Sequence, residues 1–384
     1  MPTKLIFSTM STLLLRLFRT GLVCGLFFPL LNGFSQSIGG EKEEHIAIYL
    51  DTALHKFNGV FVLVSKDSVI YSKTQGYATF KPRKPLEETS IFELASVSKQ
   101  FTAAAILQLV EQGKLNENDY LGKFFPNFPY KGITIHHLLT HQSGLPEYMD
   151  FKNKYWKDSK LSMNNKDLLN ILVQYQPKKL RAPGQKFEYN NTGYALLALI
   201  VAQVSKMSFE DYVCEHLFKP AGMTETFFYT QTLSKSSKVP EYLRLRMVKG
   251  YDLVEKERSY DYECGIIGDK GVFSTANDML LWYKALKNNM VLSPEIQKKM
   301  TTAYILSNEK DHEYYGYGLR IISTPEEEKY IYHGGLWRGF TSLFFFDPEE
   351  DFLMLVLSNY FNKAHYGKRQ EVFNILKGLD HEDL

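Results

Sequence analysis

A serine and a lysine stand three residues apart where an apolar helix is predicted to begin, in ELASVSKQFTAAAILQLVEQGKL at residues 93–115. Because positions i and i+3 lie on one face of a helix, the Ser96 hydroxyl and the Lys99 ammonium can converge on one point. A hydroxyl becomes a nucleophile when a neighbouring base takes its proton. The unpaired N–H groups and the positive dipole end of a first helical turn favour anionic charge beside Ser96. This stretch is therefore a candidate reactive centre.

Two further polar clusters are each flanked by segments that would hold them rigidly. In RAPGQKFEYNNTGYALLALIV, Tyr189 and Asn191 lie between a Pro-Gly turn and an Ala- and Leu-rich helix. A phenol near a lysine can relay a proton, and an amide side chain can bind a substrate carbonyl. In YIYHGGLWRGFTSLFFF, His333 and the two glycines after it end one predicted strand, and Gly339 starts the next. Exposed N–H groups on such an edge can help to form an oxyanion hole.

Two of these sequence motifs occur a second time, but without the same predicted structure around them. Ser307 and Lys310 repeat the S-x-x-K spacing, but no apolar helix follows them. The Y-F-N at residues 360–362 follows a predicted strand near the C-terminus. We therefore place the candidate chemistry at the first copy of each motif.

The histidines of HHLLTH at residues 136–141 raise the alternative of a zinc site. His137 and His141 are spaced for one face of a helix. No glutamate follows His137 as H-E-x-x-H requires, and Gly144 and Pro146 end the helix at once. We expect no metal and no cofactor.

The elements that must position these clusters are predicted strands at both ends of the chain and helices between them. NGVFVLVSKDSVIYSKTQGYA has two β-rich runs around a polar turn and predicts a hairpin. From about Tyr315 short β runs alternate with turn residues, and a last helix is predicted near 366–378. We expect an α+β fold, in which an antiparallel sheet built from both termini and flanked by helices carries an inserted, mostly helical domain. The other predicted helices span residues 97–112, 134–140, 166–175, 192–205, 208–218 and 276–287.

The N-terminus has the order of regions that a secretory signal requires. Residues 1–35 contain Lys4, Arg16 and Arg19 and no acidic residue, then the apolar run GLVCGLFFPLL and the small-residue segment NGFSQS. This order predicts export to the periplasm or the exterior, with an uncleaved membrane anchor as the alternative. Without these three cations the chain is close to neutral, and nothing in its charge indicates nucleic-acid binding.

The three cysteines are too few to define a fold by disulfides. Cys24 lies in the predicted signal, which leaves Cys214 and Cys264. An oxidising compartment would permit a bridge between them, and two isolated buried thiols are the other interpretation, which we favour.

The three polar motifs also carry a family resemblance. S-V-S-K at residues 96–99, Y-N-N at 189–191 and H-G-G at 333–335, in this order, resemble the motifs of serine β-lactamases and penicillin-binding proteins. The similarity is closer to the class C β-lactamase and DD-peptidase branch, in which Y-x-N replaces S-D-N. It runs from about residue 55 to 360 and includes TIHHLLTHQSGLPEY, FKPAGMTETFF, GVFSTANDM and YGYGLRI. It implies one hydrolase domain at residues 36–384 after the signal, with an α/β part at about 37–95 and 310–384 and a helical part at about 96–309.

The resemblance implies an acyl-enzyme mechanism. Ser96 would attack a carbonyl, Lys99 and Tyr189 would manage the proton, and Tyr189 would later activate the deacylating water. Asn191 would hold the amide of the substrate. The backbone N–H groups of Ser96 and of Leu336, the residue after H-G-G, would form the oxyanion hole.

His333 departs from the family pattern, because β-lactamases carry the lysine of K-T-G at this position. Related peptidases and esterases have a histidine there, so the change weakens the case for β-lactam hydrolysis and leaves the hydrolase chemistry intact. With Gly335 beside it, His333 is expected to line the substrate site. We expect a secreted or periplasmic serine hydrolase of D-amino-acid peptides, esters or related amides. Its partner would be a small molecule or a peptide, with peptidoglycan-derived material among the candidates.

Other interpretations stay open at this point. The protein is alternatively a true β-lactamase, or a non-enzymatic penicillin-binding sensor, although Tyr189 as a deacylation base argues against a sensor. Ser96 and Lys99 alone could cap and solvate a helix start, and Tyr189 could be a core aromatic residue. His333 could merely end a strand, and Arg338 could bind a substrate carboxylate or stay solvated in an exposed turn.

Overall fold

The computed structural model describes most of one compact unit. The chain divides into Met1–Ser37 and Ile38–Leu384, and the described residues belong to the second unit. They are residues 47–52, 54, 57–157, 161–229, 239–258, 262–323 and 329–361. The predicted signal at 1–35 and the predicted helix near 366–378 lie outside them.

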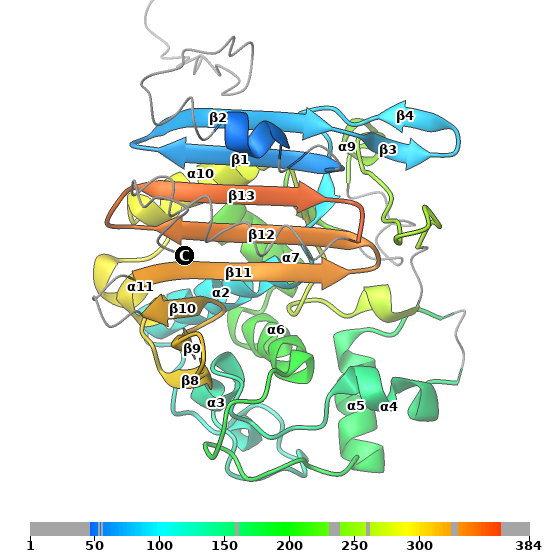
Figure 1. Cartoon of the computed structure of the whole chain (residues 1–384). Coiled ribbons are helices and arrows are strands. Elements are labelled where there is room, and N and C mark those ends of the chain that lie inside the picture. The colour runs from blue at the N-terminus through cyan, green and yellow to red at the C-terminus, as the bar shows by residue number, and fades with distance from the viewer. Residues whose placement is uncertain are drawn as a thin grey trace, which may run out of the picture. The chain divides into compact units, whose positions relative to one another are not determined.

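An eight-stranded antiparallel sheet is built from both ends of the described chain, as the sequence predicts (Figure 1). Its strand order is β2-β1-β13-β12-β11-β10-β9-β8, so the hairpin near the N-terminus pairs with the last strand, and Gly59 lies opposite Ser358. The strands are β1 Gly59–Ser65, β2 Ser68–Gln75, β8 Ile305–Asn308, β9 Glu313–Tyr315, β10 Arg320–Ser323, β11 Lys329–Trp337, β12 Phe340–Asp347 and β13 Phe352–Ser358.

Both faces of the sheet are apolar, which explains why its central strands read as continuous hydrophobic runs. Successive side chains of a strand point to opposite faces. In β12, Phe344 and Phe346 join the main core, whereas Leu343 and Phe345 join a second cluster on the other face. A shift of one residue in register would exchange the two sets, so the pattern fixes the pairing.

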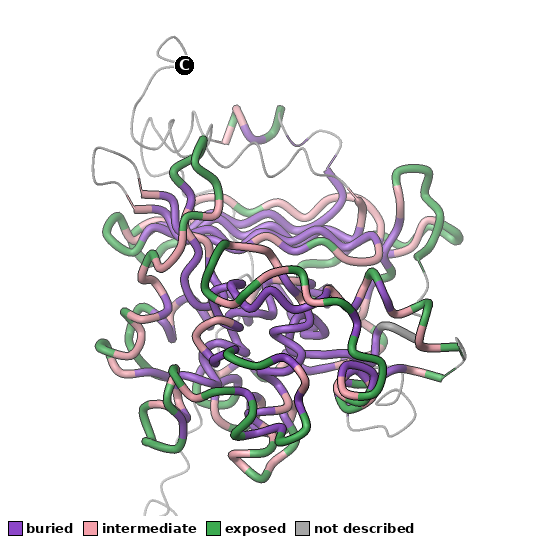
Figure 2. Tube along the Cα trace, turned by 90° about the horizontal axis from the view of Figure 1, so that it is seen from below, coloured by how far each residue is buried: buried purple, intermediate pink, exposed green. Residues whose placement is uncertain are grey.

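The main core lies between the sheet and the helices. Figure 1 shows α2 and α7 behind the sheet and α6 below β11, and Figure 2 shows buried residues where the sheet and the helical part meet. The described helices of two turns or more agree closely with the predicted spans, except for α4 and α11, which no predicted span includes. They are α2 Lys99–Glu111, α4 Tyr148–Tyr155, α5 Asn165–Tyr175, α6 Asn191–Ser205, α10 Ala276–Lys287 and α11 Pro294–Met300; shorter ones are α3 Ile135–Leu139, α7 Phe209–Val213 and α9 Glu241–Arg244.

Short strands within and beside the helical part are absent from the sequence prediction. β5 Phe92–Glu93, β7 Val272–Ser274 and β6 Phe227–Phe228 form a three-stranded sheet, and β3 Tyr77–Phe80 pairs with β4 Arg83–Pro85. Runs of two to four residues show no alternation that a period of two could reveal. The last β region also begins earlier than predicted, at Ile305 rather than near Tyr315.

In the described part of the chain, no single helix has the length and apolar composition that crossing a membrane requires. Only α6 together with residues Phe209–Phe218 reaches that length and composition, and the two helices are bent by 78° relative to each other.

The two cysteines of the described chain are not joined. Cys214 is half-buried and Cys264 is buried, and the structure holds both as thiols.

Candidate active site

Ser96 lies in a 3₁₀ turn, η1 Ala95–Ser98, that runs directly into α2 at Lys99. The predicted α-helix therefore begins later than its expected start at residue 97. Ala95 has a left-handed backbone with φ +49°, and the turn is closed by a hydrogen bond of 3.1 Å from Val97 N to Leu94 O. The Ser98 hydroxyl is buried and accepts from Val272 N at 3.3 Å, so the two serines of the motif have different environments.

Lys99 is fully buried and joins three segments through one ammonium group. Its Nζ lies 3.1 Å from Ser96 Oγ, and it donates to Asn191 Oδ1 and to Asp269 O, both at 2.8 Å. The Tyr189 ring centroid lies 4.9 Å from the same nitrogen. The structure thus brings together four residues that the sequence singled out and one, Asp269, that it did not.

The segment that carries Tyr189 and Asn191 is pinned at the start of α6. Asn190 caps this helix by accepting from Gly193 N at 2.9 Å, and its own N–H donates to His141 Nδ1 at 3.0 Å. Asn191 N donates to Glu147 Oε2 at 2.6 Å. Burial raises the pKa of Glu147 to about 7, although the hydrogen bonds from Asn191 and Met149 oppose that rise. Asn191 is therefore held by its backbone as well as by Lys99.

His333 is buried in the middle of β11, which continues to Trp337, two residues past its predicted end. A carbonyl oxygen only accepts, so Nδ1 is the donor in its 2.7 Å contact with Gly334 O. In the neutral ring, Nε2 then accepts from the Tyr315 hydroxyl at 3.0 Å. Burial and the nearby charges of Lys99 and Arg320 hold the pKa of His333 well below its usual value. The interpretation of His333 as a strand terminus is wrong.

Gly335 lets β11 approach the turn that carries Ser96. A Cβ atom at this position would collide with Ser342 Oγ and with the backbone oxygen of Leu94. Leu94 O already accepts a 2.6 Å hydrogen bond from Ser342 Oγ. The absence of a side chain here is therefore a requirement of the site's geometry.

A cavity of about 560 Å³ unites these elements. Six of the seven residues singled out in the sequence line it, and Lys99 lies behind Ser96. Sequence reasoning missed the contributions of Met149, Asp269, Lys270, Arg320, Tyr332 and Trp337. The lining residues are Ser96, Met149, Tyr189, Asn191, Asp269, Lys270, Arg320, Tyr332, His333, Gly334, Gly335, Leu336 and Trp337.

Arg320 and Lys270 supply the cationic side chains of the cavity wall. Arg320 forms an ion pair with Glu313, and its guanidinium carbon lies 5.6 Å from the Tyr189 ring centroid. In the sequence Arg320 was only part of YGYGLRI, one of the phrases that carry the family resemblance. Arg338, for which a carboxylate ligand and a solvated turn residue were both open interpretations, does not line the cavity. Its guanidinium carbon lies 5.3 Å from the Trp337 ring centroid.

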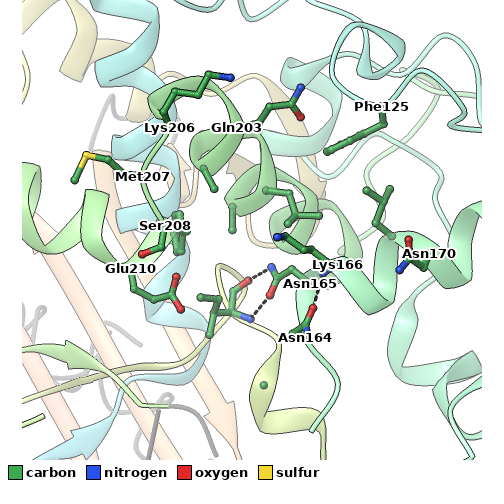
Figure 3. A pocket seen from close by; sticks show the side chains of 17 residues that line it. Phe125, Asn164, Asn165, Lys166, Asn170, Gln203, Lys206, Met207, Ser208 and Glu210 are labelled. Carbon is green, nitrogen blue, oxygen red and sulfur yellow. Dashed lines mark hydrogen bonds between the residues drawn. The ribbon is translucent and has the colours of Figure 1, made fainter. Parts of the chain in front are cut away.

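A larger cavity, of about 900 Å³, lies between α5, α6 and the start of α7 (Figure 3). Its Ser208 accepts a hydrogen bond from Asp211 N at 3.1 Å as the N-cap of α7, so this hydroxyl has a structural role. Asn165, also at its wall, bonds the backbone of Ile267. Volume alone would therefore point to the wrong place, whereas the serine–lysine contact identifies the smaller cavity.

The described residues of the second S-x-x-K copy and of HHLLTH form hydrogen bonds within the fold. Ser307 Oγ donates to Glu313 Oε1 at 2.7 Å. In HHLLTH, His137 closes the capping box of α3, and His136 contacts the Tyr317 hydroxyl at 2.8 Å. His141 Nδ1 accepts from Asn190 N. Within the described residues, no group of three or more His, Cys, Asp or Glu side chains is placed to hold a metal ion. Asn362 of the second Y-x-N lies outside those residues.

Comparison with known proteins gives consistent matches over most of the chain. A family model described as Beta-lactamase matches residues 49–377. Penicillin-binding protein 4* of Bacillus subtilis (strain 168) is 31% identical over 354 residues, covering 88% of this chain and 76% of that protein. The crystal structure of penicillin binding protein from Bacillus halodurans is 30% identical, with a TM-score of 0.73 and coverage of 86% of this chain and 99% of that one. D-amino acid amidase from Ochrobactrum anthropi SV3 is 21% identical, with a TM-score of 0.71 and coverage of 88% and 99%, a likeness of fold alone.

Proposed function

Because this chain belongs to the beta-lactamase family and is a serine hydrolase of the β-lactamase and penicillin-binding-protein fold, we propose that it acts through an acyl-enzyme on Ser96. The proposed substrates are D-amino-acid peptides, esters or related amides. The observation that carries this proposal is the set of three partners around Lys99 Nζ.

To act as the base in this proposal, Lys99 must present a lone pair to Ser96. Asp269 O can only accept, and Asn191 Oδ1 is assigned as an acceptor, so the two N–H bonds of a neutral amine point at them. The remaining lone pair then faces the Ser96 hydroxyl at 3.1 Å. This distance lies within the range for proton abstraction by a general base.

The proposed reaction has two halves. In acylation, Ser96 Oγ bonds to the substrate carbonyl carbon while its proton moves to Lys99, and Tyr189 relays a proton to the leaving group as the carbonyl–leaving-group bond breaks. The negative oxygen is held by the backbone N–H groups of Ser96 and Leu336. In deacylation, water attacks the ester carbonyl and gives a proton to Tyr189, whose own hydroxyl proton passes to Lys99. The ester C–O bond then breaks, the acid leaves, and Ser96 Oγ regains the proton from Lys99.

The charge of the cavity supports substrates that do not depend on a recognised carboxylate. His333 is neutral chiefly because its burial depresses the pKa of the ring. Arg320 is matched by its ion pair with Glu313, which reduces the net positive charge that it offers to an anion. We therefore expect simple esters and neutral-ended peptides to be cleaved faster than penicillins.

Export remains part of the proposal and rests on the N-terminal order of basic, apolar and small residues. N-terminal sequencing of periplasmic or secreted protein should begin near Gln36 or Ser37. Intact Met1 in a membrane fraction would indicate an uncleaved anchor instead.

The nucleophile and the substrate class can be tested on one purified protein. A fluorophosphonate probe should label Ser96, and Ser96→Ala should abolish labelling. Ser98→Ala and Ser307→Ala are the controls and should keep most of it, because both hydroxyls bond to the protein. Turnover is then compared on p-nitrophenyl esters, D-Ala-D-Ala peptides and nitrocefin. Labelling at Ser98 or Ser307 would overturn the mechanism; labelling at Ser96 without turnover of any substrate would favour a sensor.

A further inference from the structure

A second buried lysine, Lys270, lies at the wall of the catalytic cavity and has no role in the proposed proton transfer. Its Nζ donates to the Tyr148 hydroxyl at 2.6 Å and to Ile266 O at 3.2 Å, and it lies 3.4 Å from Asp269 Oδ2. Only 3% of its side chain is exposed. With these acceptors around it, the ammonium is committed to the protein and is not presented to a substrate.

Tyr148 closes this group into a ring. Its hydroxyl accepts from Lys270 and donates to Asp269 Oδ2 at 3.0 Å, while its backbone N–H donates to Thr192 Oγ1 at 2.8 Å. The other carboxylate oxygen, Oδ1, has no hydrogen-bond partner among the described residues. The Asp269 carboxylate is therefore held through Oδ2 alone, by Tyr148 and Lys270.

Asp269 is at the same time the residue whose carbonyl orients Lys99. The backbone before it is fixed, because Asn165 bonds both N and O of Ile267, at 3.0 and 2.7 Å, and Thr102 Oγ1 donates to Gly268 O at 2.7 Å (Figure 3 shows the Asn165 bonds). Gly268 and Gly271, on either side of the Asp-Lys pair, both have φ +98°. One backbone hydrogen bond, from Gly268 N to Lys270 O at 3.2 Å, spans Asp269. Because the flanking glycines add little stiffness, the anchoring of the Asp269 side chain also helps to set the direction of its carbonyl.

Lys270 also touches the opposite side of the cavity. Its Nζ lies 4.9 Å from the centroid of the Trp337 ring, a cation–π distance. Trp337 is the last residue of β11 and follows Leu336, whose backbone N–H is assigned to the oxyanion hole. One side chain therefore joins the segment that orients the base to the strand that faces the substrate.

We propose that Lys270 and Tyr148 are positioning residues for the Ser96 reaction: through Asp269 they fix the carbonyl that orients Lys99, and through Trp337 Lys270 steadies the end of β11. This inference rests on the proposed function of Ser96 and Lys99. A displacement of about 1 Å in a positioned group can cost on the order of 10²-fold in rate. Loss of either side chain should therefore reduce acylation by about 10- to 100-fold.

Tyr148→Phe is the first test. Tyr148 does not line the cavity, so the KM of an ester should stay within about twofold of wild type, while the acylation rate falls and its pH–rate profile changes shape. The matched control is Tyr283→Phe. The Tyr283 hydroxyl also donates to an aspartate, Asp351, at 3.0 Å, and Asp351 pairs with Lys287 at 2.8 Å. Tyr283 and Lys287 lie on α10 and Asp351 in the turn between β12 and β13, and none of the three lines the catalytic cavity. Tyr283→Phe should alter stability and leave the acylation rate unchanged.

Lys270→Arg and Lys270→Met distinguish the contribution of the Lys270 charge from that of the space its side chain fills. Arginine keeps a cation for Asp269 and Trp337 and should retain more acylation than methionine. If Tyr148→Phe does not fold, Lys270→Arg carries the test, because its acylation should still fall below that of wild type with KM nearly unchanged. Acylation of folded Tyr148→Phe, or of Lys270→Arg in its place, within twofold of wild type at every pH would overturn the inference. Failure of wild type to be labelled at Ser96 would instead overturn the proposed function.

Discussion

Replacement of Glu93 by glutamine should make the protein more stable, and increasingly so as the pH rises. Glu93 lies on β5, two residues before the turn that carries Ser96, and is 3% exposed. Burial raises its pKa to about 8; Lys270 opposes the rise, Asp269 adds to it and Arg338 opposes it. Its Oε2 has no hydrogen-bond partner among the described residues. Glutamine has nearly the shape of the protonated acid, so it removes the titration with little change in packing.

The size of the effect follows from the two pKa values. The ordinary value is 4.5 and the folded value about 8. Since the folded pKa is the higher one, the stabilising effect of the bound proton is complete below pH 4.5 and is lost as the pH rises through 8. Each pH unit between these values changes the free energy of unfolding by about 1.4 kcal/mol, and the whole interval amounts to about 5 kcal/mol. The advantage of Glu93→Gln over wild type should therefore grow over this interval and level off above pH 8.

Urea unfolding, followed by far-UV circular dichroism at intervals from pH 5 to pH 9, measures this difference. Glu313→Gln is the control, and its difference from wild type should stay constant over this pH interval. Burial alone would raise the pKa of Glu313, but the Arg320 charge and the hydrogen bonds from Tyr332 and Ser307 outweigh it and lower the pKa. Its contribution to stability is thus present at neutral pH and lost in acid. A constant difference between Glu93→Gln and wild type from pH 5 to pH 8 would refute the reasoning.

Three further changes probe the site directly. Tyr189→Phe should lower turnover by about 10²- to 10⁴-fold, the scale of a general acid–base group, and near-wild-type turnover would leave Lys99 as the sole base. His333→Lys should narrow the gap between nitrocefin and p-nitrophenyl ester turnover, because an ammonium binds a carboxylate more firmly than a neutral imidazole; an unchanged ratio would contradict this role. Gly335→Ala should lower the free energy of unfolding in urea by about 1–3 kcal/mol and slow the labelling of Ser96, because the added methyl group would collide with Leu94 O. An unchanged labelling rate would show that β11 can shift away from the turn that carries Ser96.

The residues whose type defines the chemistry were predictable from the sequence. Ser96 and Lys99 are three apart on one helical turn, so local geometry alone brings them together. Tyr189 and Asn191 were marked by the Pro-Gly turn before them and the apolar helix after them. Their convergence on Lys99 is a long-range contact, and only the order of the three motifs indicated it.

Asp269 and Lys270 could not be predicted from the sequence, because their contributions do not depend on a recognisable spacing of residue types. Asp269 acts through a backbone carbonyl, which any residue type possesses, and Lys270 acts through residues distant in sequence, such as Tyr148 and Trp337. The same limit applies to the fold. Continuous apolar runs marked long strands such as β12, but β5 has only two residues and gives no such signal, although it leads into the nucleophile turn.

The active site depends on contacts between parts of the chain that are far apart in sequence, including the pairing of β1 with β13. Ser358 Oγ donates to Asn58 O across 300 residues of sequence, and Ser342 Oγ supports Leu94 O across 248. Closing such long loops is entropically costly and slow, and its contacts form only when the distant strands meet. A nascent or C-terminally truncated chain therefore contains Ser96 and Lys99 without the strands that hold the turn. We therefore expect an active-site label to react with Ser96 only after the strands near the C-terminus have joined the sheet.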